Sequence, residues 1–195
     1  MDEQALVTRS QQGDLDAFNG LVLAYQGQAY NVALRMLGDS PSAEDATQDA
    51  FISAYRNIAS FRGGNFRAWL LRIVSNACLD QLRASKRHRT EPLDPLVLDP
   101  PGHEEMPEDY TLRQELGEEI RKGLDTLPPD QRLAIVLVDM QGLDYEEAAQ
   151  VTQSNLGTVK SRIARGRARL RDHLRARPEL LPDSIRLDSR RSPLP

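Results

Sequence analysis

The chain has 195 residues, of which 39% are hydrophobic and 28% are charged, and its formal net charge is −4. This length suits one ordinary domain or two small helical ones, and the composition excludes a wholly disordered chain. The single cysteine, Cys78, excludes an internal disulfide and a cysteine-cluster zinc site. No apolar run approaches the ~20 residues that cross a membrane, and a signal-peptide pattern is absent, so we expect a cytoplasmic protein without membrane insertion.

Helical periodicity dominates the N-terminal half, where we find no sustained alternation of the kind that strands show. Apolar residues spaced by threes and fours predict a first helix over 18–37, which Gly38 ends. Ser40 is a candidate cap for a second helix, with Pro41 at its first position and an apolar stripe over 43–58.

A break at 61–64 separates the second helix from a third. Asn65 can cap this third helix, whose apolar stripe runs over 66–82 and which ends in a basic cluster at 83–89. The aromatic, amide and cationic side chains near its start suit unstacked single-stranded bases. Core packing is the alternative for its aromatic residues, because they lie on the apolar stripe.

The composition changes between 90 and 110, where five prolines stand among acidic residues, as in an extended linker. A helical pattern resumes over 111–127 and continues, after a Pro-Pro break, to about Met140. Beyond it, a short helix, a turn at 153–155 and a last helix form a helix–turn–helix pattern. Asp144 with Glu147 provides a capping box for the short helix, and the last helix has an apolar stripe at Leu156, Val159, Ile163, Leu170 and Leu174.

These patterns predict an all-α fold with two small helical domains joined by a flexible, acidic, Pro-rich linker. The C-terminal domain contains the helix–turn–helix. The expected divisions of the chain are a first domain at 1–89, a linker at 90–110, a second domain at 111–177 and a flexible tail at 178–195.

Charge is distributed unevenly along the chain. Acidic residues dominate 91–119, whereas Lys and Arg dominate 160–177. A cationic stripe on an acidic protein is the electrostatic footprint of a nucleic-acid binder, although a solvated basic helix is the alternative. The N-terminal half of the second helix of a helix–turn–helix enters the major groove. We therefore assign base contacts to Lys160, Ser161, Ala164 and Arg165, and phosphate contacts to Arg162, Arg167 and Arg169.

The second predicted helix has a polar face formed by Glu44, Asp45, Gln48 and Asp49. This face is either solvated or a docking surface for a basic partner. No nucleophile, glycine loop or histidine converges on it, and the three histidines of the chain lack ligand spacing. We therefore expect no metal, no cofactor and no enzymatic activity.

Several segments, in this order, resemble those of the extracytoplasmic-function group of bacterial sigma factors. The similarity spans roughly residues 15–174, apart from the linker. The matching stretches are AEDATQDAF at 43–51, FRG at 61–63, FRAWLLRI at 66–73, GLDYEEAA at 142–149, GTVKSRI at 157–163 and RGR at 165–167.

The resemblance implies a protein that binds the largest subunits of core RNA polymerase, recognises promoter DNA and starts transcription under the control of an anti-sigma factor. Its polymerase-binding residues would be Asp45, Gln48, Asp49 and Phe51. Residues for the −10 element, including a pocket for a flipped base, would be Phe61, Arg62, Asn65, Trp69, Ile73, Asn76 and Arg83. Residues for the −35 element would be Thr158, Lys160, Ser161, Arg162, Ala164, Arg165 and Arg167.

Two positions depart from the family pattern, and two other functions stay open. Gly166 costs about 1 kcal/mol of helix propensity, so we expect it to loosen the end of the last helix. Ala164 is smaller than its counterpart in some members, which points to a different −35 preference. The alternatives are an independent helix–turn–helix regulator, and a sigma-like adaptor that binds polymerase without initiating transcription.

Overall fold

The computed structural model describes residues 2–88 and 107–177, and every regular element in these two ranges is helical. This confirms the all-α prediction; the tail and most of the predicted linker lie outside the described residues. No helix in the described ranges is long and apolar enough to cross a membrane. The elements are α1 (Glu3–Gln11), α2 (Leu15–Leu37), α3 (Ser40–Asn57), the 3-10 turn η1 (Ile58–Ser60), α4 (Phe66–His88), α5 (Pro107–Asp125), α6 (Pro129–Ile135), the π turn η2 (Val136–Met140), α7 (Tyr145–Thr152) and α8 (Leu156–Arg175).

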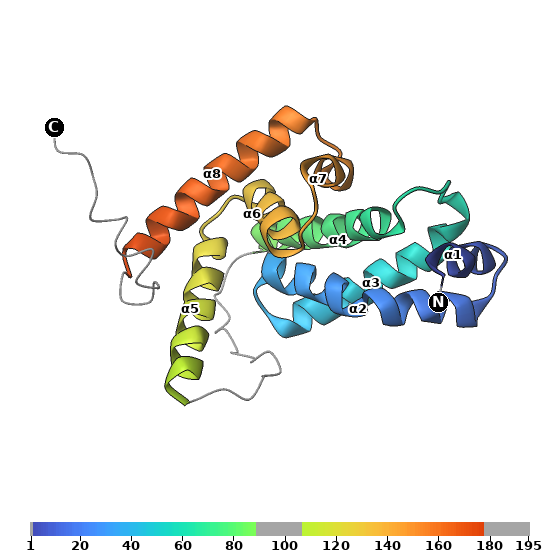
Figure 1. The fold of residues 1–195 in the computed structure, drawn as a ribbon, viewed down its shortest axis with the longest axis horizontal. Coiled ribbons are helices and arrows are strands. Elements are labelled where there is room, and N and C mark those ends of the chain that lie inside the picture. Colours follow the sequence, from blue (N-terminus) through green and yellow to red (C-terminus); the bar gives the residue numbers. More distant parts are fainter. Residues whose placement is uncertain (1, 89–106, 178–195) are drawn as a thin grey trace.

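The three long N-terminal helices α2, α3 and α4 run side by side as an elongated bundle, with α1 across one end (Figure 1). Two apolar clusters fill this bundle. The cluster at the α1 end combines Leu6 and Val7 of α1 with Phe18 of α2 and Phe66 of α4. The other cluster lies where α2, α3 and α4 meet the C-terminal helices.

Local capping explains where the N-terminal helices begin and corrects one prediction. Asp14 caps α2, accepting a hydrogen bond from the Ala17 N–H at 3.0 Å. Asp39, and not Ser40, caps α3, because the Asp39 carboxylate accepts from the Ser42 N–H at 2.9 Å. Ser40 instead lies inside the first turn, where its hydroxyl contacts Tyr30 and Glu44.

Two further helix boundaries differ from the sequence analysis. Helix α1 was not predicted, although Asp2 caps it by accepting from the Gln4 N–H. Helix α5 begins at Pro107, inside the predicted linker, and proline is well suited to the first turn of a helix because it has no N–H to leave unpaired.

The helix–turn–helix forms as predicted from its capping residues. Asp144 and Glu147 complete the capping box of α7, with the Glu147 N–H donating to Asp144 at 2.7 Å. Gln153 ends α7 in the left-handed conformation, and Asn155 caps α8 by accepting from the Thr158 N–H at 2.7 Å. These local bonds fix the turn between the two helices.

Helix α8 crosses α6 at a point of close approach that requires glycine. Gly166 is buried on the apolar stripe of α8. A Cβ atom added there would lie 2.8 Å from the Ile135 Cγ1 atom and 3.4 Å from the Gln131 carbonyl oxygen. The expectation that Gly166 loosens α8 is therefore wrong, because this residue lets the two helix backbones pack together.

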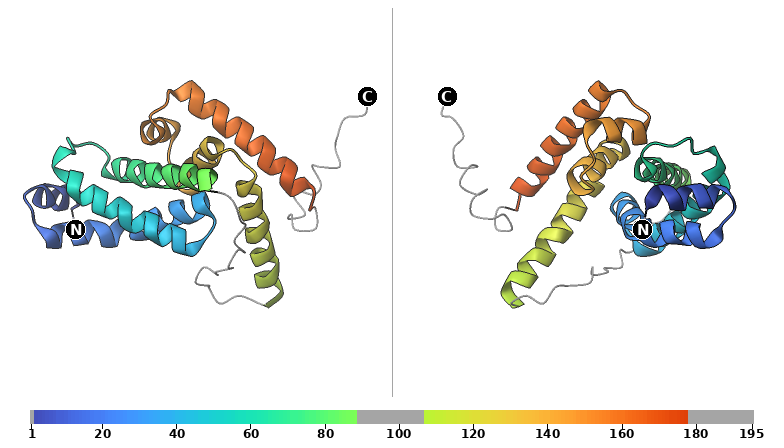
Figure 2. Two further views of the ribbon diagram at one scale, coloured as in Figure 1. Left: turned by 180° about the vertical axis from the view of Figure 1, so that it is seen from behind. Right: turned by 45° about the vertical axis from the view of Figure 1, so that its right-hand side comes forward.

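The two halves of the chain pack against each other around a shared apolar cluster. Figure 2 shows α6 and α7 packed against the side of the bundle, where they contact α2 and α4. Arg132 of α6 is buried in this contact, where its guanidinium donates to the Met36 carbonyl at 2.8 Å and pairs with Asp125 at 3.0 Å. A buried cation with two acceptors fixes the position of α6 against the end of α2.

The crossing of α6 and α8 gives a stability prediction. Gly166→Ala should lower the free energy of unfolding by about 1–2 kcal/mol, because overpacking against Ile135 outweighs the gain in helix propensity. Gly117→Ala is the matched control, since a Cβ atom at this helical position meets no atom within 4 Å. It should raise the free energy by up to ~1 kcal/mol in the same urea titration. Equal effects of both variants would contradict the close approach.

Candidate nucleic-acid and protein interfaces

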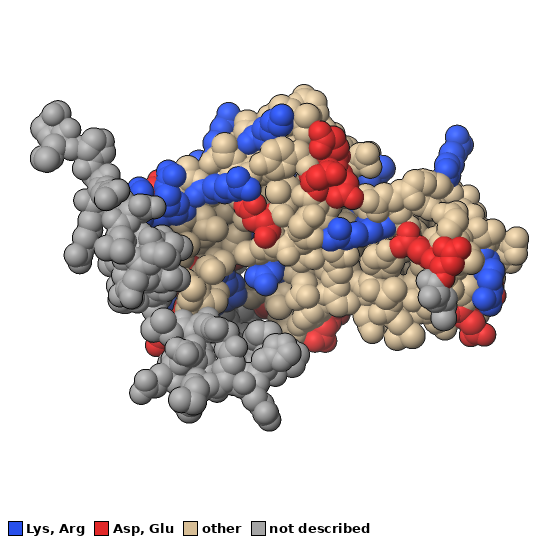
Figure 3. Space-filling view, in the orientation of Figure 1, with Lys and Arg blue, Asp and Glu red and all other residues tan. Residues whose placement is uncertain are grey.

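Helix α8 presents a cationic face away from the core. Val159 and Ile163 are buried against the neighbouring helices, whereas Lys160, Ala164 and Arg165 are exposed. Figure 3 shows Lys and Arg side chains gathered over α8. Neither Lys160 nor Arg165 forms an ion pair with another residue in the described part of the chain, so the charges of both side chains are available to an anionic ligand.

Two other arginines of α8 have intramolecular partners. Arg162 pairs with Asp130 of α6 at 2.8 Å and also donates to the Ser154 hydroxyl in the turn. Arg167 donates to both carboxylate oxygens of Asp139, a hydrogen-bonded contact that raises the pKa of this guanidinium. Both arginines therefore brace α8 against the preceding helices, a role that the sequence analysis did not assign to them.

The partly buried residues of this helix have local roles. Ser161 is half-buried, and its hydroxyl donates to the Thr158 carbonyl of the preceding turn of α8 at 2.9 Å. Ala164 is exposed between Lys160 and Arg165 and leaves room for a close approach to this face.

A second set of candidate residues lies on one face of α4 and at its start. Asn65, Trp69, Ile73, Asn76 and Arg83 are separated by four, four, three and seven residues. These spacings place them along one side of a helix. Asn65, Asn76 and Arg83 are exposed, and Trp69 and Ile73 are half-buried, so the face has polar groups beside a partly covered apolar strip.

The structure places Phe61 in the core of the bundle. Its side chain is 6% exposed, and its ring lies 5.3 Å from the Trp69 ring and 5.7 Å from the Phe66 ring, measured between centroids. The Phe61 side chain therefore cannot line an open base-capture pocket. It anchors the start of the loop in the aromatic core, whereas Arg62, Gly63 and Gly64 are exposed.

The start of α4 is joined to the start of α7. Asn65 caps α4 through its Oδ1 atom, which accepts from the Ala68 N–H at 3.0 Å, while its Nδ2 atom donates to Glu147 at 2.6 Å. The other oxygen of Glu147 accepts from the Asp144 N–H. Arg67 adds a second link, since it donates to the Gln141 carbonyl. Asn65 thus caps α4, Glu147 completes the capping box of α7, and the bond between them joins the two halves.

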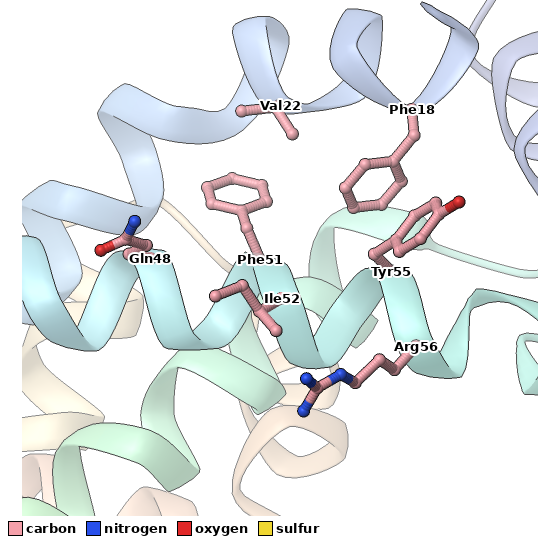
Figure 4. Close-up of a pocket in the computed structure, with 7 residues that line it drawn as sticks. All are labelled: Phe18, Val22, Gln48, Phe51, Ile52, Tyr55 and Arg56. Atoms are coloured by element: carbon pink, nitrogen blue, oxygen red, sulfur yellow. The ribbon is translucent and has the colours of Figure 1, made fainter. Parts of the chain in front are cut away.

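The polar face of α3 is exposed, as an interaction surface requires. Asp45, Gln48 and Asp49 point away from the buried alanines of this helix. Beside Gln48 lies an open, largely apolar pocket of about 520 Å³, shown in Figure 4. The pocket is formed between α2 and α3 by Phe18, Val22, Gln48, Phe51, Ile52, Tyr55 and Arg56. Phe51, predicted for partner binding, faces this pocket and is half-buried.

Reactive groups do not converge within residues 2–88 and 107–177. No cluster of three or more potential metal ligands occurs there. Cys78 is fully buried, and this burial raises the pKa of its thiol to about 12, which keeps it protonated at neutral pH. The described surfaces include an acidic and apolar face on α3, a polar face on α4 and a cationic face on α8.

Two family models match the chain, one in each half. Sigma-70 region 2 matches residues 21–88, and Sigma-70, region 4 matches residues 117–170. The chain is 38% identical over 178 residues to the ECF RNA polymerase sigma-E factor of Escherichia coli K12, covering 86% of this chain and 91% of that protein. It is 39% identical over 163 residues to the ECF RNA polymerase sigma factor SigE of Mycolicibacterium smegmatis, covering 84% of this chain but only 63% of that relative.

Two solved structures share the arrangement of helices. One is the sigma factor RpoE in complex with the anti-sigma factor NepR from Bartonella quintana, with a TM-score of 0.68 and 28% identity over 82% of this chain and 98% of that one. The other is CnrH in complex with the cytosolic domain of CnrY, with a TM-score of 0.67 and 29% identity over 90% of this chain and 98% of that one.

The bond between Asn65 and Glu147 can be tested without removing either helix cap. Asn65→Asp keeps an oxygen for the Ala68 N–H but places a carboxylate opposite Glu147. We expect the contact between the halves to weaken by about 1 kcal/mol or more, with a larger radius of gyration in small-angle X-ray scattering. Adding Glu147→Gln restores a donor opposite the new carboxylate and should restore the radius. An unchanged radius in the single variant would argue against this contact.

Proposed function

This chain belongs to the extracytoplasmic-function group of the bacterial sigma-70 family, and we propose that it is a dissociable specificity subunit of RNA polymerase. It binds the core enzyme, recognises the −10 and −35 promoter elements and initiates transcription of a dedicated set of genes. The observation that carries this function is the presence of both sigma segments, in this order, with exposed candidate faces on each. The chain is a DNA-binding regulator of transcription; we propose that it has no enzymatic activity of its own and acts in the cytoplasm.

Core polymerase docks, in this proposal, on the exposed face of α3. Asp45 and Asp49 attract a basic surface of the largest subunits, and Gln48 lies at the border between these acids and the apolar pocket. The pocket, with Phe51 on its wall, accepts an apolar side chain of the same partner. Charge provides orientation and the apolar burial provides most of the affinity.

The −10 element is read by α4 and the loop before it. During melting, a flipped base enters beside the 62–64 loop, and Asn65, Asn76 and Arg62 offer hydrogen bonds to its edge and phosphate. Trp69 supports this face and borders the melted strand. One of the two N–H groups of Asn65 Nδ2 is bonded to Glu147, so the amide can give both donors to a base only after this link breaks.

The −35 element is read by the N-terminal half of α8 in the major groove. Lys160 and Arg165 donate to base edges, and Ala164 permits close approach. Thr158 and Ser161 lie in the first two turns of the same helix, where the positive end of the helix dipole favours phosphate. Arg162 and Arg167 reach the backbone only if they exchange Asp130 and Asp139 for phosphate, so their first contribution is to hold α8 in place.

An anti-sigma factor is the regulatory partner. One solved structure with this arrangement is a sigma factor bound to an anti-sigma factor, and another is CnrH bound to the cytosolic domain of CnrY. Their helices superpose on a form in which the two halves of this chain are in contact. A protein that stabilises this form keeps one N–H of the Asn65 amide bonded to Glu147 and holds the two halves together, which disfavours the promoter-bound form.

Charge reversal on α3 tests polymerase binding. Asp49→Arg should weaken binding to core polymerase at least tenfold, because it places a cation against a basic surface. The measurement is fluorescence anisotropy of the labelled chain titrated with core enzyme. Glu115→Arg, the same charge change on an exposed position of α5, is the matched control and should change the affinity less than twofold. Tight binding by Asp49→Arg would place the docking surface elsewhere.

Charge reversal on α8 tests promoter reading. Lys160→Glu and Arg165→Glu should each reduce run-off transcription from a −35-dependent promoter by tenfold or more, with unchanged binding to core. Arg171→Glu, farther along the same helix, is the control and should retain most activity. Normal transcription by both variants would leave the α8 face without its assigned role. Core binding without any transcript would indicate an adaptor, and promoter binding without core an independent regulator.

A further inference from the structure

Helix α1 precedes both matched sigma segments, yet it contacts the loop assigned to base capture. The amide Nε2 atom of Gln11 donates to the Phe61 carbonyl at 2.7 Å and to the Ile58 carbonyl at 3.2 Å. An amide nitrogen has two hydrogens, so one group can serve both acceptors. Val7, one helical turn before Gln11 on the same face of α1, is buried in the bundle together with Leu6, which fixes the point from which Gln11 reaches this loop.

The two carbonyls belong to the turn that enters the loop. Within this turn the Phe61 N–H donates to the Ile58 carbonyl at 3.1 Å, and the Phe61 side chain is buried. The loop therefore starts from a backbone held by its own turn, by the aromatic core and by the Gln11 side chain. Of these three, the Gln11 bond is the one that holds the Phe61 carbonyl, in the peptide group that leads to Arg62.

The far end of the same loop is also fixed. Asn65 caps α4 through the Ala68 N–H. Only Arg62, Gly63 and Gly64 lie between the two anchors, and both glycines have positive φ, at +88° and +93°, with open space around them. A three-residue segment with two flexible residues would sample many shapes unless its ends were held.

We propose that Gln11 is a positioning residue for promoter melting, and that it sets the entrance of the 61–65 loop so that this loop meets the flipped −10 base in one geometry. This inference rests on the proposed function of the loop. Gln11 does not touch DNA; it acts through the Phe61 carbonyl. A loop held before binding loses less entropy when it captures a base, so removal of the two bonds slows capture.

The test uses Gln11→Glu, which keeps the shape of the side chain but removes both N–H donors, together with Gln11→Ala. Gln12→Glu, the same change at the adjacent exposed residue, is the matched control. Each variant is assembled with core polymerase, and open-complex formation is followed on a duplex promoter, on promoters with single substitutions in the −10 element, and on a template already opened there.

We expect both Gln11 variants to slow opening of the duplex promoter by about five- to tenfold, the effect of one or two lost hydrogen bonds, and to reduce discrimination against a substituted −10 base by a similar factor. For the Gln11 variants, core affinity, −35 dependence and the rate on the opened template should match those of the parent chain. The control Gln12→Glu should match the parent chain in every measurement. A merely structural role would lower the thermal midpoint while discrimination stays normal, and that result would overturn the proposal, as would normal opening rates. If the parent chain itself shows no −10 dependence, the proposed function fails instead.

Discussion

Close packing of small side chains between α2, α3 and α4 is the constraint on which the other features depend. Ala29 and Ala33 of α2 and Ala43 and Ala50 of α3 are almost fully buried, so these helices approach one another closely. The alanine stripe uses one side of α3 for the core and leaves the opposite side, with its acids, to a partner. The same packing fixes α4, whose polar face becomes the surface proposed for the melted strand.

The cations of α8 divide between internal and external partners. Arg162 and Arg167 pair with acids of α6 and η2, which offset part of the positive charge of α8 and orient the helix. Lys160 and Arg165 remain exposed on the side proposed to face the DNA groove. Exposed ion pairs each contribute little to stability, so the main effect of these two pairs is to orient α8.

The contact between the halves uses the groups that also define the helix ends. Asn65 and Glu147 each use one polar atom in a helix cap and the other in the bond between the halves. Separation of the halves therefore frees an amide and a carboxylate oxygen without unravelling α4 or α7. Under the proposed function, release of these groups on polymerase binding would break the exposed polar bonds, the buried Arg132 contact with Met36 and the shared apolar contact.

Residue patterns along the chain predicted the helices other than α1, the capping box of α7, the cap of α4 and the exposed faces of α3 and α8, because these depend on periodicity and on bonds between residues a few positions apart. The burial of Phe61, the need for glycine at 166, and the partners of Gln11 and Asn65 follow from the packing of distant segments. Gln11 lies 50 residues from Phe61, and Asn65 lies 82 residues from Glu147. No local pattern encodes such pairs, since chain folding alone brings these side chains together.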